Sequence, residues 1–122
     1  MKQLFFILFV FLSVNSIFGQ KDNAQKIDTV ATEVDFKETT LRGFQYKGVV
    51  YFVTNDMQTV TASKDGKLLW QNNVILDCEK SKSSPSQIQK IKLHKGYLHA
   101  FYGNTDIWIE PFDGSVFICG RY

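Results

Sequence analysis

The stretch YKGVVYFVTNDMQTVTASKDGKLLWQ, residues 46–71, decides the fold class. Its apolar and β-branched residues form short runs, which are separated by the dipeptides Lys47-Gly48, Asn55-Asp56 and Asp65-Gly66. Glycine accepts the positive φ that two-residue hairpin turns require, so such dipeptides indicate tight turns between antiparallel strands. With the run before Lys47, the pattern predicts four strands, at residues 41–46, 49–54, 58–63 and 68–71.

The same pattern occurs again 48 residues further along the chain. A shift of 48 aligns the two copies without a gap, so that Lys47-Gly48 falls on Lys95-Gly96 and Asp65-Gly66 falls on Asp113-Gly114. Apolar positions match as well, and Val60 falls on Trp108. The second copy therefore predicts four more strands, at residues 88–93, 97–102, 107–110 and 116–119.

Two segments lie outside these repeats. Residues 29–36 alternate apolar or β-branched with polar residues, which predicts a half-buried N-terminal strand. Residues 79–86 (EKSKSSPS) are polar and contain Pro85, so we expect a linker there. The prediction is an all-β domain over residues 29–122. Its two four-stranded antiparallel meanders, at about 41–74 and 88–122, pack as a sandwich or a partial propeller, and the N-terminal strand joins one sheet.

The residues ASKDGKLLWQ (62–71), with GVVYFVT (48–54) upstream, resemble a blade motif of the PQQ-like β-propeller family. In that motif a strand containing Ala is followed by a Gly-Lys turn and a strand that ends in Trp. The resemblance implies a blade-like local fold without a cofactor, and no quinone-binding residue is carried over. Ile118 stands where the second repeat would have its Trp, and two repeats are fewer than the roughly 4–8 blades of a closed propeller.

Residues 1–20 predict a secretory signal peptide. Lys2 supplies a positive start, residues 4–14 (LFFILFVFLSV) are almost wholly apolar, and a more polar segment follows. Cleavage after Ser16, Gly19 or Gln20 fits this pattern. An uncleaved membrane anchor is the alternative, but it would need about 20 apolar residues, and residues 4–18 are fewer. We expect a periplasmic or secreted protein with no membrane span after cleavage, a flexible segment at residues 21–28, and few contacts between the signal segment and the domain.

Cys78 and Cys119 are the only cysteines of the chain. Two cysteines in an exported domain more often pair than stay free, and the chain has no Cys-x-x-Cys redox motif. We therefore expect a structural disulfide that ties the first meander to the second. Two free thiols are the alternative.

Charge and motif content argue against several classes of protein. Lys2 is the only charged residue of the signal segment, so its removal lowers the formal net charge from +2 to +1. A nucleic-acid binder that neutralises phosphates would be more basic. We interpret the lysines between Lys80 and Lys95 as a solvated loop and one face of a strand rather than an anion site. No phosphate loop and no metal-spaced Cys/His set occurs in the sequence, so we expect neither cofactor nor metal.

Histidine and carboxylate residues are the candidates for chemistry. On the predicted strand 97–102, His99 shares a face with Tyr97 and Phe101, and we interpret it as a histidine packed beside aromatic rings. Asp106 and Glu110 would lie on one face of a strand if no bulge intervenes, where paired carboxylates could act in acid–base chemistry. Solubility at a strand edge is the simpler interpretation.

Aromatic residues are the candidates for a binding surface. A small domain needs large side chains in its core, which accounts for most of them. Because the run 97–102 has apolar residues on both faces, some aromatics must point outward. We expect Tyr102 and Trp108 to form an interaction surface.

Three functions from different classes follow. The first is a non-enzymatic binding module of the envelope or secreted space, which contacts a protein or a glycan through a sheet face or associates with itself. The second is a periplasmic inhibitor or immunity-type protein directed against a toxin. The third is a small hydrolase built on His99 with Asp106 or Glu110. The surplus of aromatic residues and the lack of a catalytic motif favour the first.

Overall fold

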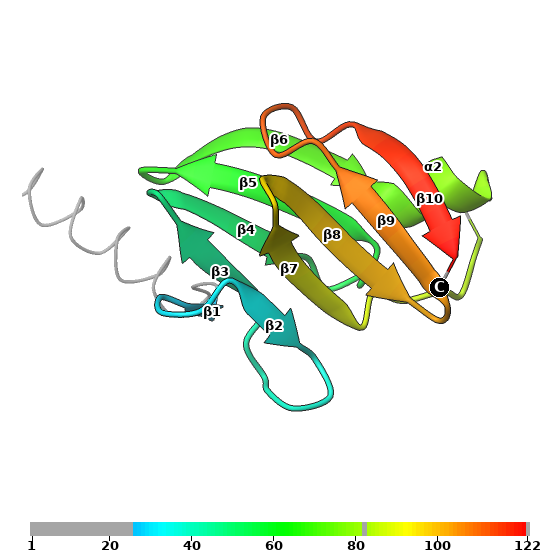
Figure 1. The fold of residues 1–122 in the computed structure, drawn as a ribbon, viewed down its shortest axis with the longest axis horizontal. Helices are drawn as coiled ribbons and strands as arrows, with labels where there is room; N and C mark the ends of the chain where they lie inside the picture. The colour runs from blue at the N-terminus through cyan, green and yellow to red at the C-terminus, as the bar shows by residue number, and fades with distance from the viewer. Residues whose placement is uncertain (1–25, 82, 122) are drawn as a thin grey trace, which may run out of the picture.

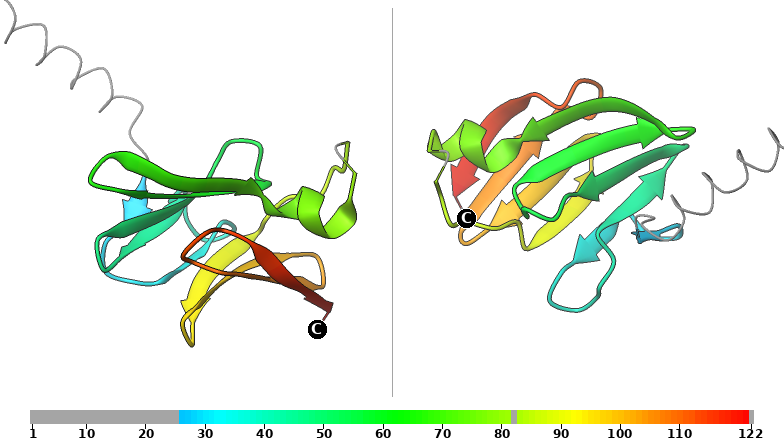
Figure 2. Two further views of the ribbon diagram at one scale, coloured as in Figure 1. Left: turned by 90° about the horizontal axis from the view of Figure 1, so that it is seen from above. Right: turned by 180° about the vertical axis from the view of Figure 1, so that it is seen from behind.

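The computed structural model describes residues 26–81 and 83–121, and it consists mainly of β-strands in two layers (Figures 1 and 2). The predicted signal peptide, its cleavage positions and its expected lack of contacts lie outside the described residues. The strands form two sheets of five strands each, and neither sheet closes on itself. The all-β prediction and the two four-stranded meanders are confirmed, whereas the prediction that only one sheet gains an N-terminal strand is wrong.

Each sheet contains one meander and one strand from the N-terminal segment. The first sheet has the order β1 (Ile27–Asp28), β3 (Gly43–Tyr46), β4 (Val49–Val53), β5 (Thr59–Lys64) and β6 (Lys67–Asn73). The second sheet has the order β10 (Val116–Arg121), β9 (Thr105–Ile109), β8 (Tyr97–Tyr102), β7 (Lys90–His94) and β2 (Glu33–Asp35). Neighbouring strands within β3–β6 and within β7–β10 are antiparallel, as the repeats predict.

The N-terminal segment does not form the single predicted strand over residues 29–36. The Asp28 carboxylate accepts hydrogen bonds from the backbone N–H groups of Val30 and Ala31, at 2.8 and 3.0 Å, which turns the chain after β1. Val30 is therefore 93% exposed rather than half-buried. The chain then crosses to the other layer, so that β1 pairs parallel with β3 and β2 pairs antiparallel with β7. The segment thus extends both sheets instead of one.

A short helix separates the two meanders, and the sequence analysis did not predict it. β6 continues to Asn73, and α2 (Val74–Glu79) follows directly. The side-chain oxygen of Asn73 accepts a hydrogen bond from the backbone N–H of Leu76 at 2.9 Å, which caps the first turn. Lys80 ends the helix in the left-handed conformation, with φ at 61°. In the described part of the chain, no helix has the length and apolar content needed to cross a bilayer.

The two cysteines form the expected disulfide. Cys78 belongs to α2 and Cys119 to β10, and their Cα atoms are 5.8 Å apart. Figure 1 shows α2 beside β10 at the end of the molecule where β6 stops. The disulfide therefore joins the chain segment that leaves the first sheet to the last strand of the second.

The core lies between the two sheets. Side chains from both layers and from α2 belong to one apolar cluster, whose fully buried large members are Phe44, Ile75, Ile88, Ile91, Leu98, Ile107, Ile109, Val34, Val53, Val60 and Val74. The Trp70 indole on β6 packs into this cluster, and its Nε1–H donates to the Pro111 carbonyl oxygen at 2.8 Å. The loop after β9 is thereby held against the first sheet.

The hairpin turns follow the repeat only in part. Lys47-Gly48, Asp65-Gly66 and Lys95-Gly96 connect paired strands directly, and all six residues have positive φ. This backbone is the one expected of two-residue turns between twisted strands. The second Asp-Gly differs, because Val116 pairs with Ile109 and the intervening residues form a longer loop. Asp113-Gly114 therefore does not form the two-residue turn that Asp65-Gly66 forms, in line with the five residues between the predicted strands 107–110 and 116–119.

Equivalent strands of the two meanders are 48 residues apart in three of the four pairs, namely β3 and β7, β4 and β8, and β6 and β10. The fourth pair, β5 and β9, is 46 residues apart. Val53 pairs with Val60 in the first sheet, whereas Phe101 pairs with Asp106 in the second. The structural counterpart of Val60 is therefore Asp106, and the sequence match of Val60 with Trp108 is wrong. Counted between these paired residues, the passage from β4 to β5 takes two residues more than the passage from β8 to β9, and the longer loop after β9 restores the offset.

Candidate functional site

The outer face of the second sheet carries a cluster of aromatic rings. Leu98 and Ala100 of β8 belong to the core, so Tyr97, His99 and Phe101 alternate with them and point outward. Trp108 pairs with His99 across the strands and lies on the same face. Together with Phe117, these four residues define the aromatic face.

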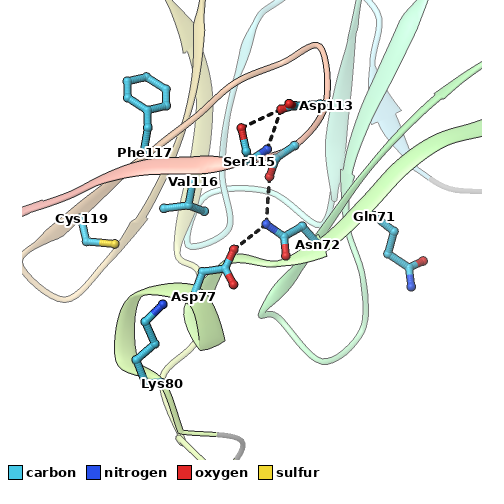
Figure 3. Close-up of a pocket in the computed structure, with 10 residues that line it drawn as sticks. Gln71, Asn72, Asp77, Lys80, Asp113, Ser115, Val116, Phe117 and Cys119 are labelled. Atoms are coloured by element: carbon cyan, nitrogen blue, oxygen red, sulfur yellow. Dashed lines mark hydrogen bonds between the residues drawn. The ribbon is translucent and has the colours of Figure 1, made fainter.

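A β-bulge brings Phe117 onto this face. In the pairing of β9 with β10, Val116 lies opposite Ile109 and Ile118 opposite Trp108, so Phe117 is an extra residue. Its ring centroid is 5.0 Å from that of Tyr97 and 6.2 Å from that of Trp108. Figure 3 shows the Phe117 side chain on one side of β10 and Val116 on the other. Phe117 is 47% exposed, so much of its ring is open to a partner.

His99 is the most buried member of the aromatic face. Its side chain is enclosed by rings, with centroids at 4.8 Å for Trp108, 6.1 Å for Phe101 and 6.0 Å for His94. Nδ1 of His99 lies 3.0 Å from Oδ1 of Asp106. Because an ionised carboxylate only accepts hydrogen bonds, this pairing holds a proton on Nδ1. Asp106 thus anchors the histidine at the centre of the face.

Two lysines border the aromatic face on the side of β7. The Nζ atoms of Lys90 and Lys92 lie 5.6 and 5.3 Å from the centroid of the Phe101 ring. Lys90 also forms an ion pair with Glu33 of β2 at 3.4 Å. Cations at such distances are attracted by the negative face of an aromatic ring. This edge of the face is therefore charged, with the carboxylates of Glu33 and Asp35 on β2 beside the two lysines, and the opposite edge at Phe117 and Ile118 is apolar.

The structure places the two residues expected to form the interaction surface on opposite faces of the second sheet. Trp108 belongs to the aromatic face. Tyr102 alternates with Phe101 and packs against the core cluster at the end of β8. Burial raises the pKa of the Tyr102 hydroxyl, with a smaller effect of the nearby Glu79 carboxylate. Tyr102 therefore does not extend the aromatic face.

The proposed hydrolase residues come together only in part. His99 and Asp106 are paired, but Glu110 lies in the loop after β9 and does not join them. There, its carboxylate accepts a hydrogen bond from the Phe112 N–H at 3.3 Å. Burial raises the pKa of Tyr51 in the first sheet, and the Glu110 charge adds to this effect. The rings and the carboxylate around His99 supply no hydroxyl or thiol nucleophile. Residues 26–81 and 83–121 also contain no group of His, Cys, Asp or Glu that could hold a metal ion.

A polar hollow of about 540 Å³ lies where α2 meets the loop before β10 (Figure 3). The Asn72 side-chain amide at its centre donates to the Asp77 carboxylate at 2.7 Å and to the Gly114 carbonyl at 2.8 Å. The backbone N–H and the hydroxyl of Ser115 both donate to Asp113 and lower the pKa of that carboxyl. These polar groups are engaged in holding the loop, so the hollow has a structural role.

Comparisons of this chain with protein-family models, with curated proteins and with solved structures found no match. The candidate site therefore rests on its own geometry. The sequence repeat identified its strands, but the contribution of Phe117 depends on a bulge within the continuous apolar run at residues 116–118. Such a run does not reveal which side chains point outward.

Proposed function

We propose that this protein is an exported, non-enzymatic interaction module that binds a partner protein through the aromatic face. The observation that carries the proposal is the exposure of large apolar side chains next to one another on that face. Tyr97 is 37% exposed, Phe117 47% and Ile118 40%, and the first two rings are in contact. Exposed apolar groups that adjoin one another are typical of protein interaction sites, and aromatic residues contribute most to such interfaces.

The arrangement of the rings favours a protein over a glycan as the partner. The planes of Tyr97 and Trp108 are inclined by 35°, those of Tyr97 and Phe117 by 59°, and those of Trp108 and Phe117 by 87°. A sugar ring stacks best on a flat platform, whereas inclined rings leave an uneven surface. Side chains of a protein can interdigitate with such a surface.

Export is part of the same proposal, and the disulfide supports it. Disulfides persist in oxidising compartments and are rare in the cytosol. The bond between Cys78 and Cys119 therefore fits a periplasmic or secreted protein whose first residues are a cleaved signal peptide. Mass spectrometry of the exported protein would then give a mature N-terminus after Ser16, Gly19 or Gln20.

We also propose that the two meanders are blade-like repeats of the PQQ-like type. The support is local: three of the four Lys-Gly and Asp-Gly turns have the same backbone, and both last hairpins contain a bulge at the same repeat position, at Leu69 and Phe117.

Affinity capture tests the binding proposal. The immobilised protein is incubated with an envelope extract of the organism that produces it, and retained proteins are identified. We expect a partner that binds the unchanged protein and the Phe112→Glu variant but not Phe117→Glu or Tyr97→Glu. Phe112 is a matched control, because it is an exposed phenylalanine in the loop before β10. Equal retention by all four proteins, or retention of polysaccharide alone, would contradict the proposal. Capture of a single toxin would instead indicate the inhibitor function.

A further inference from the structure

The two meanders have equivalent cross-strand rows that face in different directions relative to the core. In the first sheet, one row runs through Phe44, Tyr51, Ala62 and Trp70 and points into the core. Its counterpart in the second sheet runs through Lys92, His99, Trp108 and Ile118 and lies on the outer face.

The reverse relation holds for the neighbouring row. Leu93, Leu98, Ile109 and Val116 of the second sheet point into the core, and their counterparts Gln45, Val50, Ser63 and Leu68 lie on the outer face of the first sheet. Equivalent faces therefore look in the same direction. The two sheets are stacked head to tail, and they are not related by a two-fold axis that would pair equivalent faces.

This relation gives the aromatic face a specific meaning. The aromatic face of the second sheet is equivalent, by the repeat, to the inner face of the first sheet. In the first sheet, that inner face is covered by the second sheet. The surface that would cover the aromatic face in the same way is the outer face of a first sheet. We call this surface the uncharged face, and its residues are Gln45, Val50, Phe52, Ser63, Leu68 and Gln71. None of these side chains carries a formal charge.

We propose that the aromatic face binds the uncharged face of a second copy of this chain, so that the head-to-tail stacking of the two sheets continues between molecules. This inference rests on the proposed function, since it names the partner of the same surface. Val50, Phe52 and Leu68 supply apolar contacts for the rings, and Leu68 is 60% exposed.

The charges of the aromatic face are compatible with an uncharged partner surface. On the aromatic face, Lys90 is already paired with Glu33 of β2, and Lys92 lies opposite Glu33 in the strand register. Against the uncharged face, the lysines meet amide and hydroxyl groups that can accept their hydrogen bonds. The carboxylate of Asp106 is already paired with His99.

Head-to-tail contacts have a distinctive consequence for assembly. Each copy uses one surface to bind the next copy and leaves the other surface free, so association continues until a ring closes or a filament forms. Breaking either surface therefore stops growth. Two copies that are broken on different surfaces can still form one pair.

Sedimentation velocity tests this arrangement. The complete chain is expressed in an exporting host, and the purified protein is measured over a range of concentrations. The unchanged protein and the Phe112→Glu control are expected to increase in mass with concentration. Phe117→Glu on the aromatic face and Leu68→Glu on the uncharged face are each expected to weaken association by on the order of tenfold or more. Thermal unfolding shows whether each variant is folded, and Tyr97→Glu replaces Phe117→Glu if it is not.

Mixing the two variants gives the decisive result. Phe117→Glu retains an intact uncharged face, and Leu68→Glu retains an intact aromatic face. Equal amounts are expected to form a one-to-one pair that does not grow further. A symmetric interface predicts instead that Leu68→Glu associates like the unchanged protein and that mixing restores nothing, which would overturn the inference.

A monomer at all concentrations would also overturn the inference, but it would leave the proposed function standing. In that case, capture of a different protein by the aromatic face still supports a binding module. Failure of both experiments removes both proposals.

Discussion

Gly114 of the second repeat lies directly against the indole ring of Trp70 in the first. A Cβ atom added at Gly114 would stand 2.3 Å from Cε3 of Trp70, and the residue has φ at +80°. The same loop accepts the indole N–H through the Pro111 carbonyl. The contact joins Trp70 in the first sheet to the loop that leads into the last strand of the second, so it helps to fix how the two layers pack.

Gly114→Ala is therefore expected to destabilise the domain strongly. The alanine meets both an unfavourable φ and the ring of Trp70, and the expected loss is about 2–4 kcal/mol in the free energy of unfolding, measured in urea. Gly66→Ala is the matched control, because Gly66 has a similar φ of +78° but no neighbour within 4 Å of the added atom. The control should lose only about 1 kcal/mol. Equal losses would show that the contact with Trp70 contributes nothing.

Asp56 organises the loop between β4 and β5. Its Oδ1 accepts hydrogen bonds from the Thr54 hydroxyl and from the backbone N–H groups of Gln58 and Thr59, and Oδ2 accepts from the Thr59 hydroxyl. Because the loop is open to solvent, we expect Asp56→Ala to lower the free energy of unfolding by about 1–2 kcal/mol. Asp56→Asn, which retains an acceptor oxygen, should lose less. A loss as large as that of alanine would indicate that the charge is essential.

Acid should remove the contribution of Asp56. Desolvation acts to raise the pKa of this carboxyl, but the hydrogen bonds from Gln58, Thr54 and Thr59 outweigh it, and the pKa lies below its ordinary value of 3.8. A lowered folded-state pKa means that the stabilisation is complete above the unfolded-state value and is lost as the pH falls through the folded-state value. Urea unfolding between pH 6 and about pH 2 should show a smaller decrease for Asp56→Asn than for the unchanged protein.

The pair of His99 and Asp106 should matter for stability at the aromatic face. His99 is 3% exposed, so Asp106→Ala leaves a buried ring nitrogen without its partner. The expected loss is about 1–3 kcal/mol in the free energy of unfolding, whereas Asp106→Asn keeps an acceptor and should lose less. Glu110→Ala, on the loop outside this pair, is the control. If Asp106→Ala and Glu110→Ala unfold at the same urea concentration, the pair has no structural role.

Reduction of the disulfide should lower stability more than any of these surface changes. The bond closes a loop with a sequence separation of 41, which corresponds to about 4 kcal/mol in the chain-entropy treatment. The double variant Cys78→Ser, Cys119→Ser should unfold at a lower urea concentration than the unchanged protein and should not respond to a reducing agent. An unchanged midpoint after reduction would show that the packing of α2 against β10 is sufficient alone.

Sequence periodicity predicted most of the strands because their side chains alternate and their turns carry glycine. Residues 97–102 and 116–119 were predicted as strands and lie within β8 and β10. Where the strand prediction failed, local hydrogen bonds from side chains determined the structure instead. The Asp28 side chain turns the N-terminal segment, and the Asn73 side chain begins a helix at residues 74–79, ahead of the predicted linker, where no helix was expected. Such side-chain contacts compete with strand pairing and leave no periodic signal.

The residues of the aromatic face could likewise be predicted from the sequence only in part. Trp108 could be chosen from the sequence because a small domain has more aromatic residues than its core can hold. Tyr102 could not be rejected, because one register step decides whether a residue points inward or outward. Phe117 was missed, because the bulge that turns it outward depends on the pairing of β10 with β9.

The sequence by itself determined the all-β class, the two meanders and the pairing partners Cys78 and Cys119, since each depends on residue type and spacing along the chain. Only the tertiary structure decided that each sheet has a fifth strand, that the sheets stack head to tail, and that His99 meets Asp106 beneath the rings. The physical reason is that these features depend on which face of each strand is buried. Which face is buried depends on how the two sheets pack against each other, and the sequence of one segment does not specify that packing.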